Sequence, residues 1–166
     1  MTKGFTKKAE ATYDISTSFG IPKTLGKKLV KEFNESAWMV FLPAYKDARS
    51  GVAKLVEHGW KFIVITSLSL DQKAHRLRQY NLENVFGKGT FKELVCLDTG
   101  ADKDEALEQY RDSGCFWIED KPENAILGQK IGLKSILVAH DFNNVKEAQW
   151  LPRVATWKEI HEIIAG

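Results

Sequence analysis

The sequence has no long hydrophobic run and almost no net charge, and these two absences exclude several classes of protein. No apolar stretch among the 166 residues approaches the roughly 18 that a membrane span needs. Residues 1–10 are charged and no apolar stretch follows them, so we expect no signal peptide. A formal net charge of +2 is too small to indicate binding to nucleic acid or to an anionic membrane. We therefore expect a cytoplasmic protein with neither partner.

Cysteine is scarce, and the sequence contains no repeat, low-complexity tract or linker. Cys96 and Cys115 lie in apolar, strand-like runs, which favours two buried thiols over a disulfide. The length fits one domain. We expect residues 1–166 to form it, with residues 1–42 as a helical, cap-like segment and residues 43–166 as an α/β core.

Helical and extended patterns alternate along the chain. The expected strands are residues 61–66, 93–97, 115–119 and 134–138. The expected helices are residues 22–35, 47–57, 72–81, 104–111, 122–131 and 157–165. Strand and helix alternating at this spacing require right-handed crossovers and a parallel sheet. The predicted fold class is an α/β three-layer sandwich around a mostly parallel, Rossmann-like sheet.

Polar side chains follow each strand, at the edge where an open parallel sheet binds its ligands. The groups, strand by strand, are Thr66, Ser67 and Ser69; Asp98, Thr99, Asp102 and Lys103; Glu119, Asp120 and Glu123; and His140, Asp141, Asn143 and Asn144. Hydroxyls and an ammonium suit a phosphate, and carboxylates suit Mg²⁺. A cation would also relieve the repulsion between the adjacent carboxylates.

Each of these residues also has an ordinary structural explanation. A threonine that closes a strand is usually a β-former or a cap, and a lysine near a helix start is usually solvated. Asp120, two residues before Pro122, matches a helix N-cap, and His140 matches a hydrogen-bonded loop histidine. The prediction of a site depends on the ordered recurrence of such residues at successive strand ends.

That order resembles the motif order of the haloacid dehalogenase superfamily of phosphohydrolases. Its second motif, a strand ending in Thr or Ser, is similar to "FIVITS"; its third, a lysine, to "GADKDEAL"; and its fourth, an acidic pair, to "FWIEDKPENA". The stretches "LPAYKDA", "GLKSILVAHDFN" and "VATWKEI" are similar to deoxyribonucleotidase-like members and their phage-encoded relatives. The resemblance covers residues 43–164.

The resemblance implies a Mg²⁺-dependent phosphomonoesterase of the 5′-nucleotidase type, acting on a small phosphorylated metabolite or a nucleotide. It implies that Thr66 and Ser67 hold the phosphate and that Lys103 neutralises charge on the phosphoryl group. Asp120, backed by Glu119, would hold Mg²⁺. The candidates on the substrate side are Ser69, Asn124 and His140. Three aromatic residues would contact a base or sugar, or else pack in the core: Trp38, Phe41 and Tyr45.

The first motif of that family, an apolar strand ending in Asp-x-Asp, is absent. In the family its first Asp is the nucleophile and its second is the general acid and base. Asp14 in "ATYDIST" follows a polar segment, and Ser16 stands where the second Asp would be, so we do not assign Asp14 as the nucleophile. The resemblance implies that the missing strand lies mid-sheet, between the strands ending at Thr66 and Glu119. Those strands would pair directly, accept an N-terminal segment, or accept a strand from another chain.

Two functions therefore stay open: an enzyme completed by a first motif, and a catalytically inactive relative that binds a phosphate ligand, a nucleotide or a protein partner. A receiver domain of the response-regulator type also has an acidic residue, a threonine and a lysine at its site. We disfavour it, because along this sequence the order is threonine, lysine and then the acidic pair. The sequence is compatible with a monomer or a homodimer.

Overall fold

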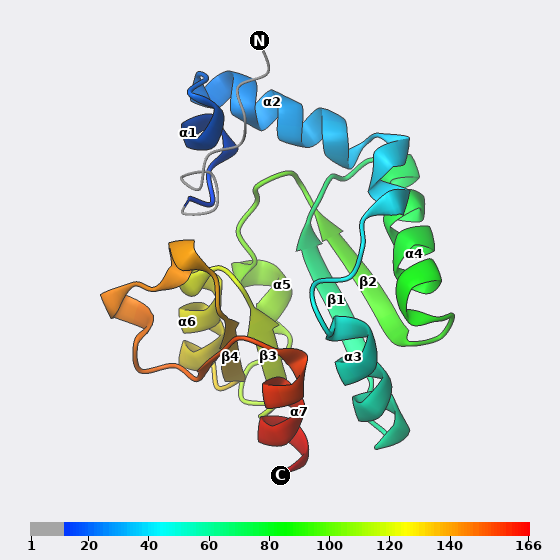
Figure 1. The fold of residues 1–166 in the computed structure, drawn as a ribbon, viewed down its shortest axis with the longest axis vertical. Helices are drawn as coiled ribbons and strands as arrows, with labels where there is room; N and C mark the ends of the chain where they lie inside the picture. The colour runs from blue at the N-terminus through cyan, green and yellow to red at the C-terminus, as the bar shows by residue number, and fades with distance from the viewer. Residues whose placement is uncertain (1–11) are drawn as a thin grey trace.

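The computed structural model describes residues 12–166, in which helices and strands alternate (Figure 1). The strands are β1 (Phe62–Ser67), β2 (Phe91–Leu97), β3 (Phe116–Glu119), β4 (Lys134–Val138) and β5 (Arg153–Val154). The α-helices are α1 (Ile15–Phe19), α2 (Lys23–Asn34), α3 (Ala48–Glu57), α4 (Gln72–Phe86), α5 (Asp104–Glu108), α6 (Pro122–Lys130) and α7 (Trp157–Ala165). Short 3₁₀ turns are η2 (Ala37–Phe41), η3 (Asp141–Asn143) and η4 (Lys146–Ala148).

The strands form a parallel arrangement that is divided in two. β1 pairs with β2 in one sheet, and the other sheet has the order β3-β4-β5, with every pair parallel. Figure 1 shows β1 and β2 as one group of arrows and β3 and β4 as another. The predicted α/β fold with a mostly parallel sheet is confirmed. Direct pairing of the strands that end at Thr66 and Glu119, one of three predicted arrangements, is wrong, because β1 and β3 do not pair.

Shared helical layers hold the two sheets together. On one face, Ile65 of β1 and Trp117 of β3 pack into the same cluster as Leu107 of α5. On the opposite face, Phe116 of β3 packs with Trp157 of α7, and Phe62 of β1 contacts the same Trp157 at 6.5 Å between ring centroids. Helices therefore cover both faces of the broken sheet, as a three-layer fold requires.

The contact between α3 and α7 depends on a glycine and on a cap. Gly51 of α3 lies against Trp157, where an added Cβ would stand 2.4 Å from the Trp157 Cβ. Asp47, just before α3, accepts hydrogen bonds from the backbone N–H groups of Trp157 at 2.9 Å and Lys158 at 3.0 Å. The first of these bonds lowers the pKa of Asp47. The start of α7 is thus fixed to the start of α3.

Replacing Gly51 by alanine is expected to destabilise the fold by about 1–3 kcal/mol, because the new methyl group must displace α7. On a helix that packs against nothing at this position, replacing glycine by alanine stabilises the fold. The sign of the change in unfolding free energy therefore shows whether Gly51 is in close contact with α7. Urea unfolding of Gly51→Ala measures the effect, with Arg49→Ala, an exposed position on the same helix, as the control. A stabilised Gly51→Ala would contradict this packing.

Most predicted elements are confirmed, with boundary shifts. Thr156 is the N-cap of α7, since its Oγ1 accepts from the Glu159 N–H. α4 continues five residues past the predicted end at Asn81, whose buried side chain instead donates to the carbonyls of Val40 and Leu42 at 2.9 and 2.8 Å. β5 was not predicted, because two residues are too short to show a period.

Two predictions of burial are wrong. Cys115 is exposed and Cys96 is half-buried, both as free thiols. Cys115 precedes the first residue of β3, so the sheet does not cover it. Trp38 and Phe41 are 70% and 72% exposed, which excludes the alternative that they are core aromatics. No described helix is both long enough and apolar enough to cross a membrane.

Candidate functional site

A short loop, residues 98–103, connects the ends of the two sheets. The Ser67 hydroxyl at the end of β1 donates to the carbonyl of Ala101 at 2.7 Å, and the Thr99 hydroxyl donates to the carbonyl of Leu68 at 2.6 Å. From the same loop, Lys103 Nζ reaches Glu119 Oε2 of β3 at 2.5 Å. The loop therefore brings together three of the predicted groups, which come from distant parts of the sequence.

The Lys103–Glu119 ion pair is buried, and both carboxylate oxygens of Glu119 accept hydrogen bonds. The side chains are 13% and 5% exposed, and the ammonium lies 5.2 Å from the centre of the Trp117 ring. Glu119 Oε2 also accepts from Asn124 at 3.3 Å, and Oε1 accepts from the N–H groups of Asp120 and Lys121 at 3.1 and 3.2 Å. Burial opposes ionisation, but the Lys103 charge and these hydrogen bonds prevail, so the pKa of Glu119 is lowered. Glu119 remains an anion at neutral pH.

Asp120 has the opposite electrostatic environment. Burial, together with the neighbouring Glu119 carboxylate, raises the pKa of Asp120 from its ordinary value of 3.8 to about 6. Its backbone is fixed, because the fully buried Asn143 donates to the Asp120 carbonyl at 2.8 Å. The site thus holds two neighbouring carboxylates. The negative charge of Glu119 is balanced by Lys103, whereas the charge of Asp120 is poorly compensated.

The two carboxylates, Glu119 and Asp120, differ in how well they suit a divalent cation. Asp120, charged and repelled by its neighbour, would gain from a divalent ion. Both oxygens of Glu119 are already occupied by donors, which favours a role in positioning Lys103 and Asp120 over direct ligation. Within residues 12–166, no group of three or more His, Cys, Asp or Glu side chains is arranged to hold a metal. Asp120 alone would hold Mg²⁺ weakly, and further oxygen ligands would have to come from outside this group.

The raised pKa of Asp120 predicts a pH effect on stability. Since the folded-state value lies above the ordinary one, folding favours the protonated form: this stabilisation is complete below pH 3.8 and is lost as the pH rises through about 6. The lost stability amounts to up to about 3 kcal/mol. Asp120→Asn should therefore be more stable than the unmodified chain at pH 8 and equal to it near pH 3.5, in urea titrations with a chelator present. An Asp120→Asn difference that does not change with pH would contradict the assignment.

The remaining predicted residues lie in different surroundings. Thr66, at the end of β1, makes no side-chain hydrogen bond with the described residues, so its hydroxyl is available. Ser69 donates to Glu35 Oε1 at 2.8 Å and accepts from the Asp71 N–H at 3.1 Å, which ties this loop to the end of α2. Asp14, which we did not assign as a nucleophile, caps α1 by accepting from the Ser16 N–H at 2.8 Å.

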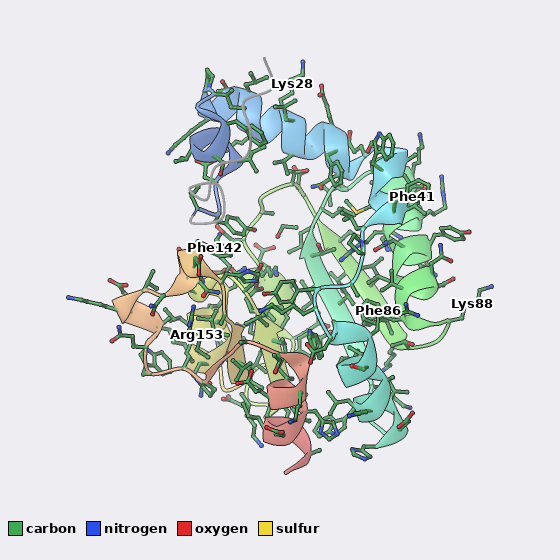
Figure 2. The ribbon with its side chains drawn as sticks, viewed as in Figure 1. Lys28, Phe41, Phe86, Lys88, Phe142 and Arg153 are labelled. Atoms are coloured by element: carbon green, nitrogen blue, oxygen red, sulfur yellow. The ribbon has the colours of Figure 1, made fainter. Side chains whose placement is uncertain are left out.

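His140 belongs to a row of aromatic rings beside Asp120. It stacks on Phe142 with an interplanar angle of 13° and contacts Tyr45, with 5.0 Å between ring centroids in both pairs. Tyr13 continues the row through an edge contact with Phe142 at 5.4 Å. Figure 2 shows Phe142 on the side of the molecule that carries α6, far from Phe41 beside α4. Burial, then the positive charges of Lys46 and Arg153, lower the pKa of His140.

Tyr13 is the site residue that sequence analysis missed, and Asn143 was named only as one of the polar residues that follow the fourth strand. Partial burial, then the charges of Asp120, Glu119 and Glu123, raise the pKa of Tyr13. Tyr13 and Phe142 line a cavity of about 500 Å³ beside the start of α6. No local signal marks Tyr13, since its role depends on a contact with a segment more than one hundred residues away.

Comparison with known proteins identifies the fold. No family model matches the sequence. A predicted phosphatase from Clostridium acetobutylicum matches the structure with a TM-score of 0.66 and 17% sequence identity, over 94% of this chain and 77% of that one. The chain shares the fold of that protein. At this sequence identity the match shows a likeness of fold alone.

A phage protein is similar in sequence to part of the chain. The uncharacterized 32.4 kDa protein in the Gp30-rIII intergenic region of Enterobacteria phage T4 is 31% identical over 94 residues. Those residues make up 57% of this chain and 33% of the phage protein. The match thus spans about a third of the length of the curated relative.

Proposed function

We propose that this chain carries the phosphate- and Mg²⁺-binding part of a phosphomonoesterase of the 5′-nucleotidase type. Its substrate would be a small phosphorylated metabolite or a nucleotide. The observation that carries the proposal is the loop 98–103, which joins Ser67 and Glu119 beside the poorly compensated carboxylate of Asp120. The likeness in fold to a predicted phosphatase and the motif order support it.

Each residue has a defined task in this proposal. The Thr66 hydroxyl and the Ser67 hydroxyl would donate to phosphate oxygens, for which Ser67 must exchange its bond to Ala101. Lys103, held by Glu119, would neutralise charge on the phosphoryl group. Asp120 would ligate Mg²⁺, which supplies electrostatic stabilisation of the phosphoryl oxygens when bound.

The nucleophile is the missing component. Among the described residues, no Asp-x-Asp sequence ends a strand, and Asp14 serves as a helix cap. We therefore expect the chain alone to bind the phosphate monoester without hydrolysing it. The inactive binding protein is the second candidate, favoured by the same absence.

Two measurements on the purified chain separate these candidates. Calorimetry with Mg²⁺ and a panel of deoxynucleoside monophosphates is expected to detect binding that weakens at least tenfold in Lys103→Ala. A phosphate-release assay with the same panel is expected to remain at the level of Lys103→Ala. Release above that control would show that the chain supplies its own nucleophile. If neither binding nor release is detected, the enzyme and the phosphate-binding protein are both refuted, and only binding of a protein partner remains.

A further inference from the structure

Two histidines from distant parts of the chain meet where α3 and α7 pack together. His58 stands directly after α3, and His161 lies within α7. The Nδ1 atom of His58 is 3.2 Å from the Nε2 atom of His161, with 5.1 Å between ring centroids and 42° between the ring planes. His58 is exposed and His161 is half-buried, so solvent and ions can reach the pair. Neither residue belongs to the candidate phosphate and Mg²⁺ site.

The backbone around His58 is held by the end of α3. The His58 N–H donates to the carbonyl of Lys54 at 3.1 Å, and the Trp60 N–H donates to the carbonyl of Leu55 at 3.0 Å. Gly59, between them, has a φ of +88°, the left-handed conformation that ends helices. His58 therefore stands at a defined position and not on a long loop.

The packing of α7 on α3 brings His161 to the same place. Trp157 lies against Gly51, and Asp47 accepts from the first N–H of α7. Trp157 and His161 are four residues apart and thus share one face of α7. Gly51 and His58 are seven residues apart, two helical turns, and thus share one face of α3. Figure 1 shows the two helices side by side.

The distance between the two nitrogens matches two ligands on one metal ion. Imidazole nitrogens bind Zn²⁺ at about 2.1 Å, so two nitrogens 3.2 Å apart would subtend an angle of about 100° at a shared ion. That angle lies between about 90° for square-planar or octahedral sites and about 109° for tetrahedral sites. The existing geometry therefore needs little change to hold an ion.

Loading the pair requires only a shift of one proton within a ring. In the metal-free pair, one nitrogen donates its N–H to the lone pair of the other. A metal ion takes both lone pairs, and the donating ring then carries its proton on its second nitrogen. Neither ring makes another hydrogen bond within residues 12–166, so this change of tautomer breaks no further contact.

The ligand type selects the ion. Neutral imidazole suits Zn²⁺, Ni²⁺ and Cu²⁺, whereas Mg²⁺ prefers oxygen. In the part of the chain that the structure describes, no third His, Cys, Asp or Glu completes a metal-binding group with this pair. Water would fill the remaining coordination positions, as an exposed site permits.

We propose that His58 and His161 chelate a divalent transition-metal ion such as Zn²⁺ or Ni²⁺, at a site separate from Asp120. The two ligands are 103 residues apart in the sequence, so the unfolded chain does not hold them together. The ion therefore binds the folded chain in preference to the unfolded one and stabilises the fold by linkage. It would join α7 to α3 a second time, beyond the cap that Asp47 provides.

Calorimetry with NiCl₂ on the full, untagged chain tests the proposal, with excess Mg²⁺ present to occupy oxygen sites. We expect one Ni²⁺ per chain, bound at least about tenfold more weakly by His58→Gln and by His161→Gln, since each variant retains a single imidazole. His75→Gln is the matched control, because His75 contacts the Leu94 carbonyl elsewhere. It should bind Ni²⁺ as the unmodified chain does, and so should Cys115→Ser, which removes the exposed thiol.

Two measurements with Zn²⁺ identify the ligating atoms and the effect on the fold. In nitrogen NMR, the signals of His58 Nδ1 and His161 Nε2 should move to metal-bound positions, while those of His75 and His140 should not change. In urea unfolding, Zn²⁺ should raise the midpoint of the unmodified chain and should leave the midpoint of either single histidine variant unchanged.

Several outcomes would overturn this proposal. One is the absence of saturable Ni²⁺ binding, and another is binding that persists in either histidine variant or disappears in Cys115→Ser. Half an ion per chain, together with a dimer in light scattering, would show that the ion bridges two copies and not two helices of one chain. None of these readouts involves phosphate binding or release, so failure here is distinguishable from failure of the proposed function.

Discussion

Replacing Lys103 by methionine is expected to destabilise the protein by about 3–5 kcal/mol at pH 7, since it leaves the Glu119 carboxylate buried without a counter-charge. The loss should shrink as the pH falls. Glu119 has a lowered pKa, so the stability that its charge contributes is present above its ordinary value of 4.5 and is lost as the pH falls through the lower folded-state value. Urea unfolding between pH 3 and pH 8 measures both effects.

Two further variants identify the cause of that loss. The double variant Lys103→Met/Glu119→Gln removes both charges and should recover at least half of the lost stability. Lys88→Met removes an exposed lysine at the far side of the molecule (Figure 2) and should change stability by less than about 0.5 kcal/mol. A loss below about 1 kcal/mol in Lys103→Met would show that the ion pair is open to solvent.

Asn143→Leu is expected to cost about 3–5 kcal/mol, because this fully buried amide serves four partners at once. Its Nδ2 donates to the carbonyls of Asp120 and Val138 at 2.8 and 2.6 Å, and its Oδ1 accepts from the His140 N–H and from Arg153 Nε at 2.9 and 3.2 Å. Leucine has similar volume but leaves these groups unpaired. Urea unfolding measures the cost.

The neighbouring Asn144→Leu is the matched control, since Asn144 is exposed. It should change stability by less than about 0.5 kcal/mol. Amide exchange should also accelerate around Asp120 in Asn143→Leu, because the carbonyl of that residue loses its donor. An Asn143→Leu chain as stable as Asn144→Leu would mean that water replaces the amide.

Sequence reasoning succeeded where the signal is local. Each of the four longer strands contains at least three consecutive apolar residues, and the capping residue Thr156 stands directly before the helix that it stabilises. The same reasoning placed Lys103 at the end of a strand but not its ion pair with Glu119, which is a contact across 16 residues. The order of polar residues at strand ends was therefore predictable, whereas their mutual geometry was not.

What could not be predicted depends on distant contacts. Nothing near Asn143 in the sequence shows that its amide will join the ends of β3 and β4, and nothing near Tyr13 shows that its ring will lie against Phe142. The exposure of Trp38 and Phe41 has the same origin, since aromatic residues are normally expected in the interior.

The capping of α7 by Asp47 has a consequence for the order of events during synthesis. The Asp47 carboxylate meets its two N–H partners only after about 110 further residues have been made. Until then the apolar side of α3 around Gly51 has no Trp157 to cover it, and β1 lacks the ring that later packs on Phe62. A growing chain that stalls before residue 157 would expose this surface, which makes it a target for chaperones and proteases.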